Sequence, residues 1–238
     1  MPITEILILA ILSLFQSIFG VGLLIFGTPA FLLLGYSFFD VLNILLPYSI
    51  IISLMQLVFY KSDSRDFSLN FLKFTIPTVI LSLYILSLYN DKINFLLLTS
   101  LTIIIFSIFN IFKKDFILIP SKNSKTFHYW LIFLGLIHGF TNLGGSLLTL
   151  ISTSINKYKN DIRGNIASGY LLLGITQMIY INIFITQFDF SYLKYIYIPI
   201  LSILLTRSIY KNINDESFSF ILNILILFYG LYIFFMNI

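Results

Sequence analysis

Six apolar runs of roughly twenty residues restrict this chain to a membrane fold. They cover residues 40–60, 67–89, 93–112, 164–187, 192–209 and 218–237. A helix of this length crosses a hydrocarbon core of ~30 Å. The chain is also 58% hydrophobic and only 10% charged, which excludes a water-soluble globular domain. The sequence therefore predicts an all-α integral membrane protein.

Two further apolar segments, residues 3–34 and 127–155, are too long for one crossing and too short for two. Glycine breaks each of them near its middle, at "FGVG" (19–22) and at "NLGG" (142–145). Two arrangements fit this pattern. Each segment is either one broken crossing, which gives eight transmembrane helices, or a re-entrant helical hairpin that enters and leaves on the same side.

The positive charges favour the hairpins, because cytoplasmic loops of membrane proteins carry an excess of Lys and Arg. Eight crossings would divide the 14 Lys and Arg residues almost evenly between the two sides. Two hairpins instead leave Lys92 and Lys194 alone against all the others. We therefore expect two re-entrant hairpins, both termini outside, and Lys/Arg-rich loops on the cytoplasmic side of the inner (plasma) membrane.

The two halves of the chain resemble each other at an offset of about 122 residues. This offset places Asn43 on Asn165 and Pro77 on Pro199, and a one-residue slip places Gln56 on Gln177. Each half then holds one hairpin and three crossings, and an odd number of crossings turns the second copy upside down. The sequence predicts two inverted repeats, residues 1–118 and 119–238, within a single membrane domain, which is the plan of many secondary transporters.

The glycine breaks predict a binding site, because non-helical backbone at membrane depth persists only inside protein or along a watery cavity. A half-helix that starts after a break presents free N–H groups and partial positive charge, which suit an anion. The alternative is that small residues merely allow close helix packing. The substrate-binding residues expected at the two breaks are Gly20, Gly22, Thr28, Thr141, Asn142, Gly144, Gly145 and Ser146.

Four amide side chains and one histidine lie within apolar segments. We expect the amides to line the substrate path, the alternative being hydrogen bonds between helices. His138 is the one titratable group expected at depth, and it either couples transport to protons or packs as a neutral, hydrogen-bonded side chain. The four amides are Asn43, Gln56, Asn165 and Gln177.

Other function classes lack the residues that they need. The chain has no cysteine, no phosphate-binding loop and no metal-ligand spacing, and we expect no carboxylate in the middle of a crossing. We therefore expect neither an enzyme nor a cofactor or metal site. The expected partners are a small anion and membrane lipid, and no nucleic acid. The sequence leaves open whether the protein forms a homodimer.

Three stretches together resemble the sulfite exporter TauE/SafE family of membrane permeases: "QSIFGVGLLIFGTPAFLLLG" (16–35), "GFTNLGGSLLTL" (139–150) and "RGNIASGYLLLG" (163–174). The family carries a motif of the type G-x-x-x-G-x-x-G-x-G-G in each half. Here the first copy is reduced to Gly20-Val21-Gly22, with Pro29 after it, and the second has Asn142 where glycine is usual.

The resemblance implies transport of small anions such as sulfite or an organosulfonate. Joined to the predicted repeats, it implies a secondary transporter that works by alternating access at a midplane site between the two hairpin tips. A passive anion channel and a non-transporting membrane subunit are the alternatives.

Overall fold

The computed structural model describes residues 2–60, 64–111, 125–156 and 158–211, together with residues 228, 231–232 and 234–235. These residues contain α-helices and two short 3₁₀ helices, and no strand is found among them. The elements are α1 (Ile3–Phe19), α2 (Leu23–Leu33), α3 (Phe38–Tyr60), α4 (Arg65–Tyr89), η1 (Asn90–Lys92), α5 (Phe95–Ile111), α7 (Lys125–Thr141), α8 (Gly145–Ile155), α9 (Lys159–Phe184), η2 (Phe190–Tyr195) and α10 (Tyr197–Lys211).

The expected all-helical fold is confirmed for this part of the chain. Three of its helices are long and apolar enough to cross a membrane, at Phe38–Phe59, Arg65–Tyr89 and Asn160–Phe184, within α3, α4 and α9. The predicted crossing at 218–237 and the predicted boundary between the repeats at 118 and 119 lie outside the described residues.

The predicted crossing at 192–209 is not one continuous helix. Its first residues form η2, which the side chain of Asp189 caps by accepting the N–H of Ser191 at 2.8 Å. Pro199 lies in the first turn of α10, where its missing N–H costs no helical hydrogen bond. The α-helix that follows η2 is therefore only 15 residues long.

Each glycine-broken segment forms a pair of helices joined by a three-residue turn. The first broken pair is α1 and α2, joined by residues 20–22, and the second is α7 and α8, joined by residues 142–144. The rings of Phe15 in α1 and Phe26 in α2 lie 5.2 Å apart, so α2 folds back along α1. At ~1.5 Å per residue, a helix as short as α2 does not cover a ~30 Å core.

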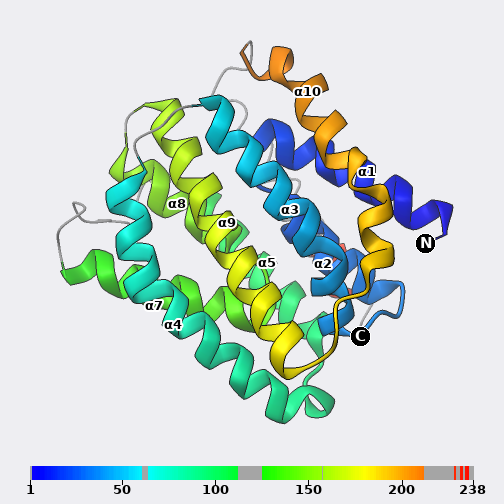
Figure 1. The fold of residues 1–238 in the computed structure, drawn as a ribbon. Coiled ribbons are helices and arrows are strands. Elements are labelled where there is room, and N and C mark those ends of the chain that lie inside the picture. Colours follow the sequence, from blue (N-terminus) through cyan, green and yellow to red (C-terminus); the bar gives the residue numbers. More distant parts are fainter. Residues whose placement is uncertain are drawn as a thin grey trace.

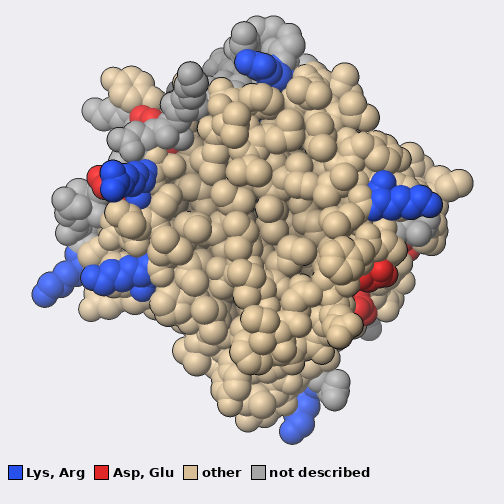
Figure 2. Space-filling model, in the orientation of Figure 1, with Lys and Arg blue, Asp and Glu red and all other residues tan. Residues whose placement is uncertain are grey.

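The central helices α3 and α9 pack side by side through the middle of the molecule (Figure 1). The broken pairs lie on either side of them, with α1 packed against α10 and α7 packed against α4. Figure 2 shows a face whose centre is uncharged, with Lys, Arg, Asp and Glu confined to its margins. A surface of this kind suits contact with lipid tails.

Candidate functional site

The turn of the first broken pair depends on two glycines. Gly20 has a φ of 77° and Gly22 a φ of 129°, and residues other than glycine rarely adopt such backbone angles. A Cβ atom at Gly22 would lie 2.6 Å from the ring of Phe15. The N–H of Gly20 donates to the carbonyl oxygen of Gln16 at 2.8 Å and closes α1. The chain can therefore reverse at once and begin α2 at Leu23.

The turn of the second broken pair is built from side-chain hydrogen bonds as well as glycine. Asn142 has a φ of 60°, and asparagine tolerates this left-handed region better than most residues. The N–H of Leu143 donates to Oγ1 of Thr141 at 3.1 Å, and the N–H of Gly144 donates to Nδ1 of His138 at 3.2 Å. These bonds satisfy backbone donors that the break in the helix leaves free.

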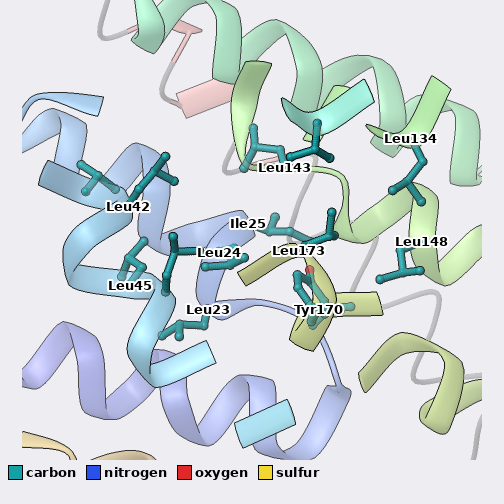
Figure 3. Close-up of a cluster of buried hydrophobic side chains, with 14 of the residues drawn as sticks. Leu23, Leu24, Ile25, Leu42, Leu45, Leu134, Leu143, Leu148, Tyr170 and Leu173 are labelled. Carbon is teal, nitrogen blue, oxygen red and sulfur yellow. The ribbon is translucent and has the colours of Figure 1, made fainter. Parts of the chain in front are cut away.

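The start of α8 lies directly against α9. A Cβ atom at Gly145 would fall 1.6 Å from the hydroxyl oxygen of Tyr170, so this position excludes any larger residue while Tyr170 keeps its place. Side chains from α2, α3, α7, α8 and α9 pack around Tyr170 in one buried cluster (Figure 3). The turns of both broken pairs are therefore held inside the protein core.

The two broken pairs contact each other where the turn of the second pair lies against α2 of the first. Nδ2 of Asn142 donates to Oγ1 of Thr28 at 3.0 Å, which links the second turn to the side of α2. A Cβ atom at Gly145 would also lie 3.3 Å from Cδ1 of Ile25, near the start of α2. The structure thus brings together three residues predicted from sequence to bind substrate, Thr28, Asn142 and Gly145, although they come from opposite halves of the chain.

Two of the predicted amides hold the last turns of α1 and α7. Nε2 of Gln56 donates to the carbonyl oxygen of Gln16 at 3.0 Å, and Nε2 of Gln16 donates to Oγ of Ser49 at 3.1 Å. In the second half, Nε2 of His138 lies 3.1 Å from Oε1 of Gln177. Each broken pair is thus tied to the long central helix of its own half, α3 or α9.

The other predicted residues are distributed around this centre. Asn43 and Asn165 are buried in the central helices, whereas Ser146 is only half-buried in the first turn of α8. The hydroxyl of Thr141 also donates to the carbonyl oxygen of Ile137 at 2.7 Å. Within the described part of the chain, no hydrogen bond joins Asn43, Asn165 or Ser146 to Thr28 or Asn142.

Many buried polar atoms around the turns have no hydrogen-bond partner in the structure. A buried polar group without a partner costs free energy, and a bound water molecule or ligand can supply the missing partner. They include Oε1 of Gln16, Oδ1 of Asn43, Oε1 of Gln56, Oδ1 of Asn142, both amide atoms of Asn165, the hydroxyl of Tyr170 and Nε2 of Gln177.

The helices α2 and α8 both begin at these turns. Neither N-cap residue, Gly22 or Gly144, places a side chain on the first N–H groups of its helix. Those N–H groups have no acceptor within the helix, and the helix dipole adds partial positive charge to them. Two such helix starts close to one another can hold a small anion.

Several buried residues were not predicted from the sequence to lie near the site. The offset between the halves lays Gln16 on His138 and Tyr48 on Tyr170, and this signal was available for both pairs. Arg163 was counted among the loop charges because polar residues precede it. The structure instead buries its side chain at 4% exposure in α9, where the guanidinium donates to the carbonyl oxygen of Ser17.

Comparison with known proteins gives one match. The family model for the sulfite exporter TauE/SafE matches residues 6–236. Neither a curated protein nor a solved structure matches the chain.

Proposed function

This chain belongs to the sulfite exporter TauE/SafE family, a family of membrane transporters, and from that premise we propose that it is a secondary transporter of a small anion. The transported anion is sulfite or an organosulfonate. The protein works by alternating access, with the anion bound where the turn of the second broken pair meets α2 of the first.

The bounds of the helices support an inverted repeat. A shift of 122 residues carries α1, Ile3–Phe19, onto α7, Lys125–Thr141, and carries α2, Leu23–Leu33, onto α8, Gly145–Ile155. The packing partners correspond in the same way. Helix α1 of the first half contacts α10 of the second half, and α7 of the second half contacts α4 of the first. With three crossings in each repeat, the two broken pairs act as re-entrant hairpins from opposite sides of the membrane.

The hydrogen bond between Asn142 and Thr28 is the observation that carries the proposal. It joins the turn of the second broken pair to α2 of the first, at 3.0 Å and away from solvent. We expect the free N–H groups and positive dipole ends of α2 and α8 to bind the anion beside this bond. Rocking one repeat against the other would open this region first to one side and then to the other.

Transport by purified protein in proteoliposomes tests the proposal. We expect saturable uptake of sulfite or sulfoacetate, accelerated by the same anion on the opposite side. Asn142→Gly keeps the left-handed backbone but removes the amide, and we expect it to lower kcat/KM about tenfold, because the hydrogen bond to Thr28 that joins the two broken pairs is lost. Asn70→Ala, which removes an amide bonded only to the carbonyl oxygen of Asp66, serves as the control.

Two results would contradict the proposal. Flux no greater than that of empty vesicles for every anion would exclude transport of this class. Flux without acceleration by anion on the opposite side would indicate a passive channel instead of alternating access.

A further inference from the structure

His138 makes two hydrogen bonds that together determine which ring nitrogen carries the proton. The side chain is fully buried in the last turn of α7. Its Nδ1 accepts the backbone N–H of Gly144 at 3.2 Å, so Nδ1 has no hydrogen of its own. The neutral imidazole then carries its hydrogen on Nε2, which lies 3.1 Å from Oε1 of Gln177 and donates to it.

The bond from His138 determines how Gln177 presents its amide. Because the oxygen of this amide faces His138, its two N–H donors must point elsewhere. Gln177 is fully buried, and its Nε2 has no hydrogen-bond partner in the structure. A buried amide nitrogen of this kind can donate a hydrogen bond to a ligand. It forms its strongest hydrogen bond with an anionic oxygen.

A second donor lies on the same face of α9. Tyr170 precedes Gln177 by seven residues, which is two helical turns, and its buried hydroxyl also has no partner. This hydroxyl lies against Gly145 at the start of α8, and the ring of Tyr170 stands edge-on to that of His138, with centroids 6.4 Å apart. The face of α9 beneath the second turn thus carries donors from two side chains.

The first half differs in the polarity that it presents. In the first half, Gln16 is the counterpart of His138. Gln16 and Gln56 both use their amide nitrogens for hydrogen bonds within the protein. The amide oxygens of both residues are left without partners. The second half also has unpartnered oxygens, on Asn142 and Asn165, but only there do amide nitrogens, on Asn165 and Gln177, lack partners among these amides. Amide nitrogens attract an anion, so selection for negative charge falls to the second half.

We propose that His138 is a positioning residue that holds the amide of Gln177 as a hydrogen-bond donor to the transported anion. This inference rests on the proposed function. It assigns His138 a neutral, fixed role and assigns the direct contact with the anion to Gln177. The substrate class that this arrangement favours is an oxyanion with an exposed acceptor oxygen, such as a sulfonate or sulfite.

Isosteres of histidine separate its two bonds. In His138→Asn, the amide oxygen takes the place of Nδ1 and keeps the bond to Gly144, but the donor to Gln177 is lost. In His138→Gln, the amide nitrogen takes the place of Nε2 and keeps the donor to Gln177. We expect His138→Asn to raise the KM for sulfite in counterflow about tenfold with little change in melting temperature. We expect His138→Gln to lower the melting temperature and leave KM within about threefold of the unmodified protein.

A double mutant tests whether His138 acts through Gln177. Gln177→Leu alone should raise KM about tenfold or more, and adding His138→Asn should raise it no further, because coupled residues are not additive. Gln177→Glu provides a test without any change at His138. It still accepts the bond from His138, but it has no N–H and adds a negative charge, so sulfite binding should be lost.

Three results would overturn the inference. These are an unchanged KM in His138→Asn, additive effects in the double mutant, and sulfite affinity retained in Gln177→Glu. Each of them, obtained alongside normal flux by the unmodified protein, leaves the proposed function intact. Absence of flux by the unmodified protein would instead overturn the proposed function and this inference together.

Discussion

Single residues decide how closely the two halves approach each other. Asn142 illustrates this, because its left-handed backbone forms the turn and its amide contacts the other half. The φ of 60° lets the chain reverse, and Nδ2 reaches Thr28 in the other half at 3.0 Å. Glycine would allow the turn but could not form this bond. The sequence pattern predicted Asn142 as a site residue. It did not predict the hydrogen-bond partner of the amide, which lies 114 positions away.

Glu5 shows the same limit of sequence reasoning. Its position near the start of the chain predicted a carboxylate on the outer side of the membrane and not at depth, yet its side chain is only 5% exposed. Oε1 of Glu5 accepts the hydroxyl of Tyr36 at 2.5 Å, which joins α1 to the turn that follows α2. The bond to Glu5 raises the pKa of Tyr36 from 10.0 to about 12.

Removing the Tyr36 hydroxyl should therefore destabilise the protein. We expect Tyr36→Phe to lower the free energy of unfolding by about 1–3 kcal/mol at pH 8, since it takes a donor from a buried carboxylate. The pKa of Tyr36 is raised in the folded state, so this contribution is full below pH 10 and is lost as the pH rises through about 12. Denaturant unfolding in detergent micelles at pH 8 and at pH 11 measures both effects.

Tyr84→Phe provides the control, because the Tyr84 side chain is 54% exposed on α4. Equal stability of Tyr36→Phe and Tyr84→Phe at pH 8 would show that the bond to Glu5 contributes nothing.

At the scale of elements, α4 and α7 form one of the two most extensive helix contacts in the described part of the chain. Hydroxyls on α4 donate to carbonyl oxygens on α7, from Thr75 to Leu131 at 3.1 Å and from Thr78 to Ile132 at 3.3 Å. Gly135 lies at the crossing, as close packing of small residues in membrane helices requires. This contact fixes the second broken pair against the first half of the chain.

Enlarging Gly135 should separate α4 from α7. A Cβ atom there would lie 2.0 Å from Oγ1 of Thr78 and 2.5 Å from the backbone oxygen of Thr75, which cannot rotate away. We expect Gly135→Ala to lower the free energy of unfolding by about 1–3 kcal/mol, the usual cost of overpacking. Denaturant unfolding in detergent measures this loss.

Gly174→Ala is the matched control for Gly135→Ala. There the added Cβ would meet only the side chain of Ile50, at 2.7 Å from Cγ1, and a side chain can change its rotamer. A cost for Gly135→Ala no larger than that for Gly174→Ala would contradict the proposed role of the backbone contact.

Elements were more predictable than the contacts between them. Both glycine breaks fall where the sequence indicated, because Gly20 and Asn142 have positive φ angles that few residues other than glycine and asparagine adopt. The run at 192–209 begins as η2 and not as α-helix, which hydropathy could not predict because it does not register the cap that Asp189 forms there. The hydrogen bond from His138 to Gln177 was equally hidden, since the register between α7 and α9 is set by packing and not by local sequence.

At the scale of the whole molecule, we propose that two similar halves combine to form one site. The halves exchange their packing partners around α3 and α9, and their broken pairs meet at Thr28 and Asn142. If the pairs are re-entrant hairpins, the first opens toward one side of the membrane and the second toward the other. The function proposed here depends on that arrangement, because alternating access requires a gate from each side.

Sidedness of single cysteines tests this arrangement most directly, and the chain has no cysteine of its own to interfere. Lys92→Cys, Tyr158→Cys and Lys194→Cys place thiols between helices, after α4, before α9 and before α10. We expect an impermeant thiol reagent added to intact cells to label Lys92→Cys and Lys194→Cys but not Tyr158→Cys. Eight crossings would put Lys92 and Tyr158 on one side and Lys194 on the other, and labelling in that pattern would contradict the account.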